Sequence, residues 1–486
     1  MSRTPIYNFH NAKLSVAQSA IRENVARLTP GAPESGPFAY HPIMQAAGHV
    51  LERVYRGEVR DARTALRAYD RRRARQAAEG MMVSTPPEVR ADCLDLLTRY
   101  VIAWVFDDRD AMREISTQWK FGPCDVAGAL ELLEDWLAYY WRGAEPHYNP
   151  PTAAGPGPFP LPPPASPGAP LRVGMLGDWG TGSLEAGVVI DQLMRQAPDL
   201  IIHVGDVYYS GTEAEQRAML TMLRAARAAH GRNIPFYTLP GNHEYYAGGA
   251  AFYEVTPRFN EGVPNASAQE HSFWCLRNDM WQLQGMDTGY YDSDLLTKDE
   301  DITRLRDDEA VWHRRQLVDA GGRQVILFSH HQLFSAFEKI GGQWQNPYLT
   351  QNLRDWEAAA NLRPAAWFWG HEHVLGIYEV PGSLPVLGRL VGNSAIPVFV
   401  NTEAYIPKPE GAPMQPAECS PDGRIQFPNG YVQSQQEDLA WCSGFAMLEL
   451  ASDGTAKAEY WQVTFEGDVR DASCQVLWEE GIPAAS

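Results

Sequence analysis

Cysteine, long apolar runs and positive charge are all scarce in this sequence. The six cysteines lie far apart and form no C-x-x-C pair, which excludes a zinc clip or a dense disulfide framework and is typical of reduced thiols. No run of about eighteen apolar residues occurs, so a membrane-spanning helix is not expected. The first residues, MSRTPIYNFHNAKLSV, lack the apolar core of a secretion signal, and we therefore expect a cytoplasmic protein.

Acidic residues outnumber basic residues by a wide margin. The 60 aspartates and glutamates against 41 lysines and arginines give a formal net charge of −19. Such a charge disfavours polyanionic partners, so we expect neither a nucleic acid nor a membrane as partner. Apolar residues make up 44% and charged residues 21% of the chain, a composition typical of globular proteins.

The 486 residues are enough for two domains, and the composition changes along the chain accordingly. Residues 1–145 are predicted to form a helical N-terminal domain, in which apolar side chains repeat at helical spacing over 14–28, 89–104 and 130–140. The second of these segments follows a capping box that begins at Thr85. We expect this domain to cap an active site or to mediate self-association.

A proline-rich stretch at 146–170 is predicted to be an extended linker. It leads into a second domain over 171–486, in which about 395–430 is predicted to be a long insertion. Short β-rich runs then alternate with helical stretches, namely LRVGMLGD, LIIHVGD, PFYTLPGN, QVILFSHH and AAWFWGHEH. This alternation predicts an α/β domain with crossover helices, which GFAMLEL and AKAEYWQVTF close as an antiparallel hairpin.

Each of the five runs ends in a turn that carries side chains able to bind metal. Ligand-binding side chains gather at the carboxyl ends of strands in α/β sheets, so we expect these turns to meet in one crevice. The donors are carboxylates, an amide, imidazoles and a phenol, which suit hard or borderline metals. Seven candidates exceed the four that one zinc needs and suggest two metals about 3.5–4 Å apart. They are Asp178, Asp206, Tyr209, Asn242, His330, His371 and His373.

These turns resemble, in order, the five motifs of the calcineurin-like metallophosphoesterases, and most of all their purple acid phosphatase branch. The motifs here are GDWG at 177–180, GDVYY at 205–209, GNHE at 241–244, the histidine after LFS at 330, and GHEH at 370–373. Gly180 replaces the histidine of the commoner D-x-H motif, while Tyr209 adds a phenol. The resemblance implies a β-sandwich flanked by helices in four layers, αββα, within the α/β class.

The resemblance also implies how the ligands are divided between the two metals. Asp178, Tyr209 and His373 would bind the first metal, Asn242, His330 and His371 the second, and Asp206 would bridge them. A phenol keeps its proton to about pH 10, so ligation by Tyr209 requires a strongly acidifying ion. The resemblance makes that ion Fe(III), with Fe, Zn or Mn at the second site. The fourth motif departs from the V-x-x-H of the family, so His331 stays an alternative to His330.

Two metals that face one water can lower its pKa from 15.7 towards about 7 and supply hydroxide to attack phosphorus. His243 is then placed to protonate the leaving group, with a bracing role as the alternative, and His331 is a candidate phosphate contact. We predict a metal-dependent hydrolase of small phosphate monoesters. Phosphodiesters, either cyclic nucleotides or glycerophosphodiesters, are the alternative substrates, and an inactive scaffold protein is the alternative from another class.

Two further polar residues lie in or next to strand-like runs. His203, inside LIIHVGD, is expected to be a core or ligand-bracing histidine. Asp287 follows another short apolar run and either orients a ligand or forms a turn.

Overall fold

The structure, a computed structural model, describes most of residues 42–78, 91–152, 156–293, 302–398 and 431–482, with a few positions between 404 and 413 and Ala484. The chain forms two compact units, Met1–Glu131 and Leu132–Ser486. The domain boundaries and the linker drawn from composition stay a prediction. Among the described residues, no helix is both long and apolar enough to cross a membrane.

All the regular elements that the structure describes in the first unit are helices. It contains α2 (Pro42–Tyr55), α3 (Ala62–Ala78), α4 (Ala91–Val105) and the beginning of α6 (Val126–Tyr140). Val50, Tyr69 and Ile102 are completely buried where the first three of these helices meet. The helices expected over 89–104 and 130–140 are confirmed as α4 and α6, whereas 14–28 and the capping box at Thr85 lie outside the described residues.

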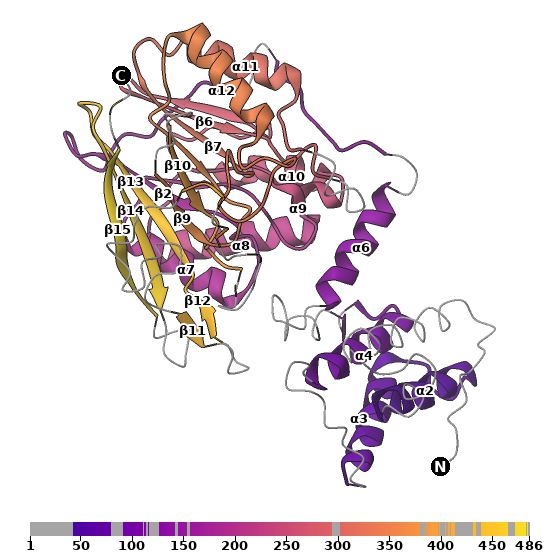
Figure 1. The fold of residues 1–486 in the computed structure, drawn as a ribbon. Coiled ribbons are helices and arrows are strands. Elements are labelled where there is room, and N and C mark those ends of the chain that lie inside the picture. Colours follow the sequence, from indigo (N-terminus) through magenta and orange to yellow (C-terminus); the bar gives the residue numbers. More distant parts are fainter. Residues whose placement is uncertain are drawn as a thin grey trace. The chain divides into compact units, whose positions relative to one another are not determined.

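Two β-sheets form the centre of the second unit (Figure 1). The six-stranded sheet has the order β15-β14-β13-β2-β3-β4, and the seven-stranded sheet has the order β1-β5-β6-β7-β8-β10-β9. The strands of the first sheet are β2 (Leu171–Leu176), β3 (Leu200–His203), β4 (Phe236–Thr238), β13 (Gly444–Leu450), β14 (Ala456–Thr464) and β15 (Ser473–Ile482). Those of the second are β1 (Phe159–Pro160), β5 (Trp274–Arg277), β6 (Trp281–Met286), β7 (Gln324–Ser329), β8 (Ala366–Trp369), β9 (Leu375–Ile377) and β10 (Leu387–Val391). A separate hairpin pairs β11 (Tyr431–Gln433) with β12 (Leu439–Trp441).

Helices cover the outer face of each sheet, as Figure 1 shows for α11 and α12 on one side and for α7 and α8 on the other. The helices of this unit are α7 (Leu184–Arg195), α8 (Glu213–His230), α9 (Asn242–Tyr246), α10 (Ala250–Val255), α11 (Asp307–Val318) and α12 (Pro347–Ala360), with a 3₁₀ helix, η2 (Thr256–Asn260), after α10.

Three apolar clusters separate these layers. Along β2, Val173 and Met175 point into the core between the sheets, whereas Leu176 packs with α7 and α8. Along β7, Phe328 points into the core between the sheets and Leu327 packs under α11 and α12. Because strand side chains alternate between faces, both sheets can bury both surfaces. The expected four-layer αββα sandwich is confirmed.

The five β-rich runs singled out in the sequence are β2, β3, β4, β7 and β8. Strands β2, β3 and β4 pair in parallel, and so do β7 and β8, so the turns that follow them lie at one edge of each sheet. The expected closing hairpin is β13 and β14, which pair in antiparallel fashion. Most of the insertion expected at about 395–430 lies outside the described residues.

The carboxyl-terminal half of α6 and the segment after it pack within the second unit. The Trp136 indole donates to the Ser293 carbonyl over 2.9 Å, and the Tyr140 hydroxyl donates to the Tyr245 carbonyl, at the end of α9, over 2.7 Å. The His147 amide donates to the Gly248 carbonyl over 2.8 Å. These contacts join α6 and the segment after it to α9 and to the loops at Gly248 and Ser293.

Candidate metal centre

Three of the predicted ligands have a left-handed backbone. The φ angles of Asp178, Asp206 and His371 are 56°, 74° and 69°. Such conformations cost on the order of 1–3 kcal/mol each and cluster at functional sites. The His371 amide donates to Asp178 Oδ2 over 2.9 Å, so the turn after β8 in one sheet is joined to the turn after β2 in the other.

Glycine allows the turns to approach one another closely. A Cβ atom at Gly241 would lie 2.6 Å from His330 Nε2, and one at Gly205, where φ is 110°, would lie 2.5 Å from His330 Nδ1. Any larger residue at either position would displace the imidazole. The glycines before Asp206 and Asn242 therefore make room for the donor atoms themselves.

The first donor group contains Asp178, Asp206 and His373, whose candidate ligand atoms lie within 4.8 Å of one another. Both carboxylates are buried, and His373 Nε2 lies 3.4 Å from Asp178 Oδ1. The hydroxyl of Tyr208 lies between them, 2.8 Å from Asp178 Oδ1, 2.8 Å from Asp206 Oδ2 and 3.0 Å from His373 Nε2. A carboxylate pair, an imidazole and a phenol thus surround one small volume.

The phenol in this group comes from Tyr208, whereas the sequence motif indicated Tyr209. Tyr209 contributes its backbone, because its amide donates to Glu215 and its carbonyl accepts a hydrogen bond of 2.6 Å from His243 Nδ1. The sequence GDVYY offers two adjacent tyrosines, and counting from Asp206 selects the second one. The geometry favours Tyr208 as the phenolic ligand.

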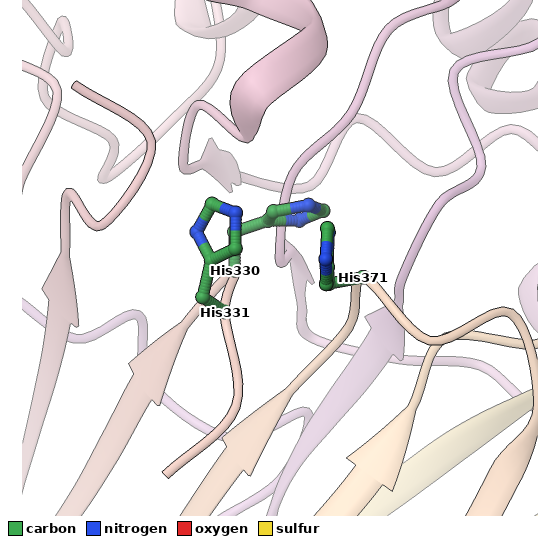
Figure 2. A group of neighbouring side chains, drawn as sticks. All are labelled: His330, His331 and His371. Carbon is green, nitrogen blue, oxygen red and sulfur yellow. The ribbon is translucent and has the colours of Figure 1, made fainter. Parts of the chain in front are cut away.

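The second donor group contains His330, His331 and His371, which Figure 2 shows with their rings gathered at the ends of neighbouring strands. His330 Nδ1 donates to the Val204 carbonyl over 3.0 Å, so its Nε2 is the nitrogen that faces the crevice. His330 Nε2 and His371 Nδ1 each lie 3.2 Å from Asn242 Oδ1. The structure therefore brings together the three residues expected to bind the second metal.

Both ring nitrogens of His331 already have protein partners. Nδ1 lies 3.0 Å from Thr288 Oγ1, and Nε2 lies 3.0 Å from Asp292 Oδ2. Its ring packs against that of His371 with the centroids 4.5 Å apart. This arrangement favours His330 as the ligand and gives His331 the role of a brace for His371. Sequence reasoning missed Thr288 and Asp292, because neither lies in a recognised motif.

Asp206 belongs to the first donor group and also faces the second, with one oxygen directed to each. Oδ2 faces the Tyr208 hydroxyl in the first group, while Oδ1 lies 3.4 Å from His330 Nε2 in the second. Oδ1 also accepts a hydrogen bond of 3.2 Å from the His243 amide, which fixes the carboxylate plane. A single carboxylate in this position can bind two cations through separate oxygens.

The side chain of His243 is oriented by the turn that follows β3. Because Nδ1 donates to the Tyr209 carbonyl, Nε2 is directed towards the crevice and lies 3.9 Å from Asp206 Oδ2. The side chain is 18% exposed, so Nε2 is within reach of a bound molecule. Burial lowers the pKa of this imidazole below its usual value.

The carboxylates, the imidazoles and the phenol of this centre shift one another's pKa values. Burial raises the pKa of Asp206, but His330 and His243 outweigh that effect and hold it well below its usual range. Burial lowers the pKa of His330, but Asp206 outweighs it and raises the value to about 10. Burial, Asp178 and Asp206 together raise the pKa of the Tyr208 phenol well above its usual value.

The donor atoms suit metal ions, and they form two groups, each of which could hold one ion. Two groups of carboxylate, imidazole, amide and phenol donors share one carboxylate, and no thiol takes part, which suits hard or borderline ions. A cation at the first group would reverse the effect of the carboxylates on Tyr208 and favour the phenolate. The turns and the sandwich thus bring two adjoining groups of candidate metal ligands together in one α/β domain.

Comparison with known proteins identifies the class of this domain. Residues 171–375 match the family described as calcineurin-like phosphoesterase. This segment is therefore a domain of the metallophosphoesterase superfamily, a metal-dependent family, and the main resemblance seen in the sequence is confirmed. The finer resemblance to the purple acid phosphatase branch stays a prediction.

Individual relatives are distant. A probable glycerophosphodiester phosphodiesterase, GpdQ, from Arcobacter nitrofigilis is 23% identical over 138 residues, which are 28% of this chain and 43% of that protein, so the match spans less than half the length of the relative. Among solved structures, a dimetal phosphatase from Danio rerio is 11% identical with a TM-score of 0.36 and covers 64% of this chain and 100% of its own. The protein TT1561 of Thermus thermophilus is 12% identical with a TM-score of 0.32 and covers 46% of this chain and 90% of its own.

The two polar residues outside the motifs have structural partners. His203 is completely buried, and its Nδ1 lies 2.9 Å from Thr238 Oγ1, in agreement with the core position expected. Asp287 forms a turn by accepting from the amides of Gly289 and Tyr290. It also accepts a hydrogen bond from the Tyr245 hydroxyl and so contacts α9, the helix that carries Asn242.

Proposed function

We propose that this chain hydrolyses phosphate esters at a centre of two metal ions. The observation that carries the proposal is the position of Asp206, whose two oxygens face two separate donor groups. The match of residues 171–375 to a metal-dependent phosphoesterase family supports it. An inactive scaffold would need neither two donor groups nor strained ligand turns.

The residues that would hold the ions follow from the two donor groups. Asp178, Asp206, Tyr208 and His373 would bind the first ion, and Asp206, Asn242, His330 and His371 the second. When bound, the two ions would activate a water as nucleophile and neutralise charge on the phosphoryl oxygens. A phenol that ligates at neutral pH favours Fe(III) at the first site, with Fe, Zn or Mn at the second.

The protein's own side chains would orient the ligands and move one proton. His243 presents Nε2 to the crevice and holds Nδ1–H on the Tyr209 carbonyl, so its imidazolium form would give the Nε2 proton to the leaving alkoxide and remain as the neutral Nδ1–H tautomer. His331, held by Thr288 and Asp292, would keep His371 in place instead of contacting phosphate. Asp206 would stay ionised throughout, because its pKa lies far below neutrality.

Two ester classes remain as substrates. A phenol in the first donor group, together with the resemblance to the purple acid phosphatase branch, favours monoesters. The relative named as a probable glycerophosphodiester phosphodiesterase favours diesters as the second candidate. The net charge of −19 slows the capture of polyanions and favours small esters in either case.

The test measures metal content together with turnover of p-nitrophenyl phosphate and bis(p-nitrophenyl) phosphate. We expect about two metals per chain and turnover of at least one ester. Replacing Asp206 by Asn should lower kcat by at least 10²- to 10³-fold, a loss of the size seen when one preorganised electrostatic group is removed, and should release metal. Asp191→Asn, at a half-exposed ion pair with Arg195 on α7, is the matched control and should change neither quantity.

The ratio of the two turnover rates separates monoesterase from diesterase. Two bound metals without turnover of any ester would favour the scaffold instead. A protein that binds no metal under any condition would remove the basis of the proposal.

A further inference from the structure

Tyr246 contacts the amide of Asn242 from the last position of α9. The two residues are four apart, so their side chains lie on the same face of the helix. Asn242 Nδ2 donates to the Tyr246 hydroxyl oxygen over 2.7 Å. Tyr246 is 1% exposed and Asn242 5%, so water does not compete freely for this hydrogen bond.

The direction of this hydrogen bond decides which end of the amide faces the crevice. With Nδ2 turned to Tyr246, Asn242 Oδ1 lies 3.2 Å from both His330 Nε2 and His371 Nδ1. The opposite orientation of the amide has nearly the same shape but would point two N–H donors at those nitrogens. Only the oxygen can ligate a cation, so an amide that turned over would remove one ligand.

The hydroxyl of Tyr246 can be removed by a substitution that keeps the ring. Its ring packs edge-on against His243 with the centroids 4.9 Å apart, and a phenylalanine would keep that contact. The Asn242 amide donates to the hydroxyl oxygen, which a phenylalanine lacks. The hydroxyl is thus the part of Tyr246 that acts on Asn242.

We propose that Tyr246 is a positioning residue, which holds the Asn242 amide with its oxygen towards the second metal. The inference rests on the proposed function, because it assigns a role towards one of the two ions. It adds a residue that lies outside the five motifs and that no donor group contains. Loss of such a partner of a metal ligand typically costs 10- to 100-fold in metal affinity.

The experiment follows metal retention in the full-length holoprotein. Metal per chain is measured after dialysis against a graded series of chelator concentrations. Tyr246→Phe should lose one of its two metals at a chelator concentration 10- to 100-fold lower than the unsubstituted protein does. In an Asn242→Asp background the same substitution should have little further effect, because either carboxylate oxygen can ligate.

Tyr245→Phe is the matched control, since it removes a hydroxyl from the same helix that donates to Asp287 and not to Asn242. It should retain both metals as tightly as the unsubstituted protein. The inference is overturned if Tyr246→Phe retains both metals normally, if Tyr245→Phe loses metal equally, or if the loss is the same in the Asn242→Asp background. A protein that never binds two metals contradicts the proposed function itself and is recognised before any variant is made.

Discussion

At the scale of single residues, the contacts of the Tyr208 hydroxyl predict a property that can be measured directly. It lies within 3.0 Å of three donor atoms, from Asp178, Asp206 and His373, in a place where burial disfavours its ionised form. A strongly charged ion there would favour the phenolate, and a phenolate bound to Fe(III) absorbs visible light. The identity of the phenolic ligand can therefore be read from colour.

We expect iron-loaded protein to be violet and Tyr208→Phe to lose the visible absorption band. Tyr209→Phe should keep the band, because Tyr209 contributes its backbone to the site. Visible spectra at equal iron content per chain provide the measurement. A band lost in Tyr209→Phe and kept in Tyr208→Phe would restore the assignment made from the motif, and colourless protein with bound Zn or Mn would reject iron.

Residue types at the centre could be predicted from sequence, but their orientation could not. His330 comes directly after β7 and Asp206 three residues after the last residue of β3, so the strands fix their place at the sheet edge. The choice between Tyr208 and Tyr209 depends on the path of a turn, and the partners Thr288 and Tyr246 depend on contacts between side chains. Only the four-residue spacing of Asn242 and Tyr246 within α9 was a usable signal for such contacts.

At the scale of elements, α11 is attached to β6 through a buried histidine. His313 Nδ1 donates to Gln284 Oε1 over 2.7 Å, and Nε2 lies 3.3 Å from Glu309 Oε1. Burial lowers the pKa of His313 to about 3. The helix is therefore held to the sheet by an imidazole that stays neutral in the folded protein.

Acidification should weaken this attachment. Below pH 6.5 the unfolded chain binds a proton at His313 and the folded chain does not, so stability is lost as the pH falls from 6.5 towards 3. The loss is about 1.4 kcal/mol per pH unit at most. The free energy of unfolding is measured in urea with chelator present. Between pH 7 and pH 5.5 we expect it to fall by about 1 kcal/mol less in His313→Gln than in the unsubstituted protein. If both proteins lose the same amount of stability, His313 does not contribute to the loss on acidification.

The elements that could be predicted are those whose sequence pattern is unambiguous. Buried parallel strands such as β3 and β7 appear as continuous apolar runs bounded by turns, so they were found. The arginine-rich helix α3 has a weak apolar periodicity, and it was not singled out. Strands β5 and β10 are not singled out by the sequence pattern either, although each pairs with a strand that is near in the sequence.

At the scale of the whole molecule, the second unit depends on residues that precede its first long strand. Leu161 is 6% exposed and belongs to the core between the sheets, and β1 pairs with β5. Trp136 and Tyr140 add hydrogen bonds to Ser293 and Tyr245. The phosphoesterase match begins only at residue 171, so these contacts lie outside it.

Two truncations should therefore differ. A chain without residues 1–125 keeps α6 and should keep ester turnover within about two-fold. A chain without residues 1–170 also loses β1, Leu161 and the hydrogen bonds of α6, and should be less stable by several kcal/mol. Thermal unfolding and turnover measure both effects, and light scattering on the shorter deletion tests self-association through the helical region. Equal stability of the two chains would show that residues 126–170 contribute nothing.

Both sheets of the sandwich contribute ligands to the proposed pair of ions. Asp178, Asp206, Tyr208 and Asn242 follow strands of the six-stranded sheet, and His330, His371 and His373 follow strands of the seven-stranded sheet. Each ion would therefore be bound by both sheets at once, and its binding energy would add to the cooperativity of folding. Removal of the metals would then lower the stability of the whole sandwich as well as abolish its activity.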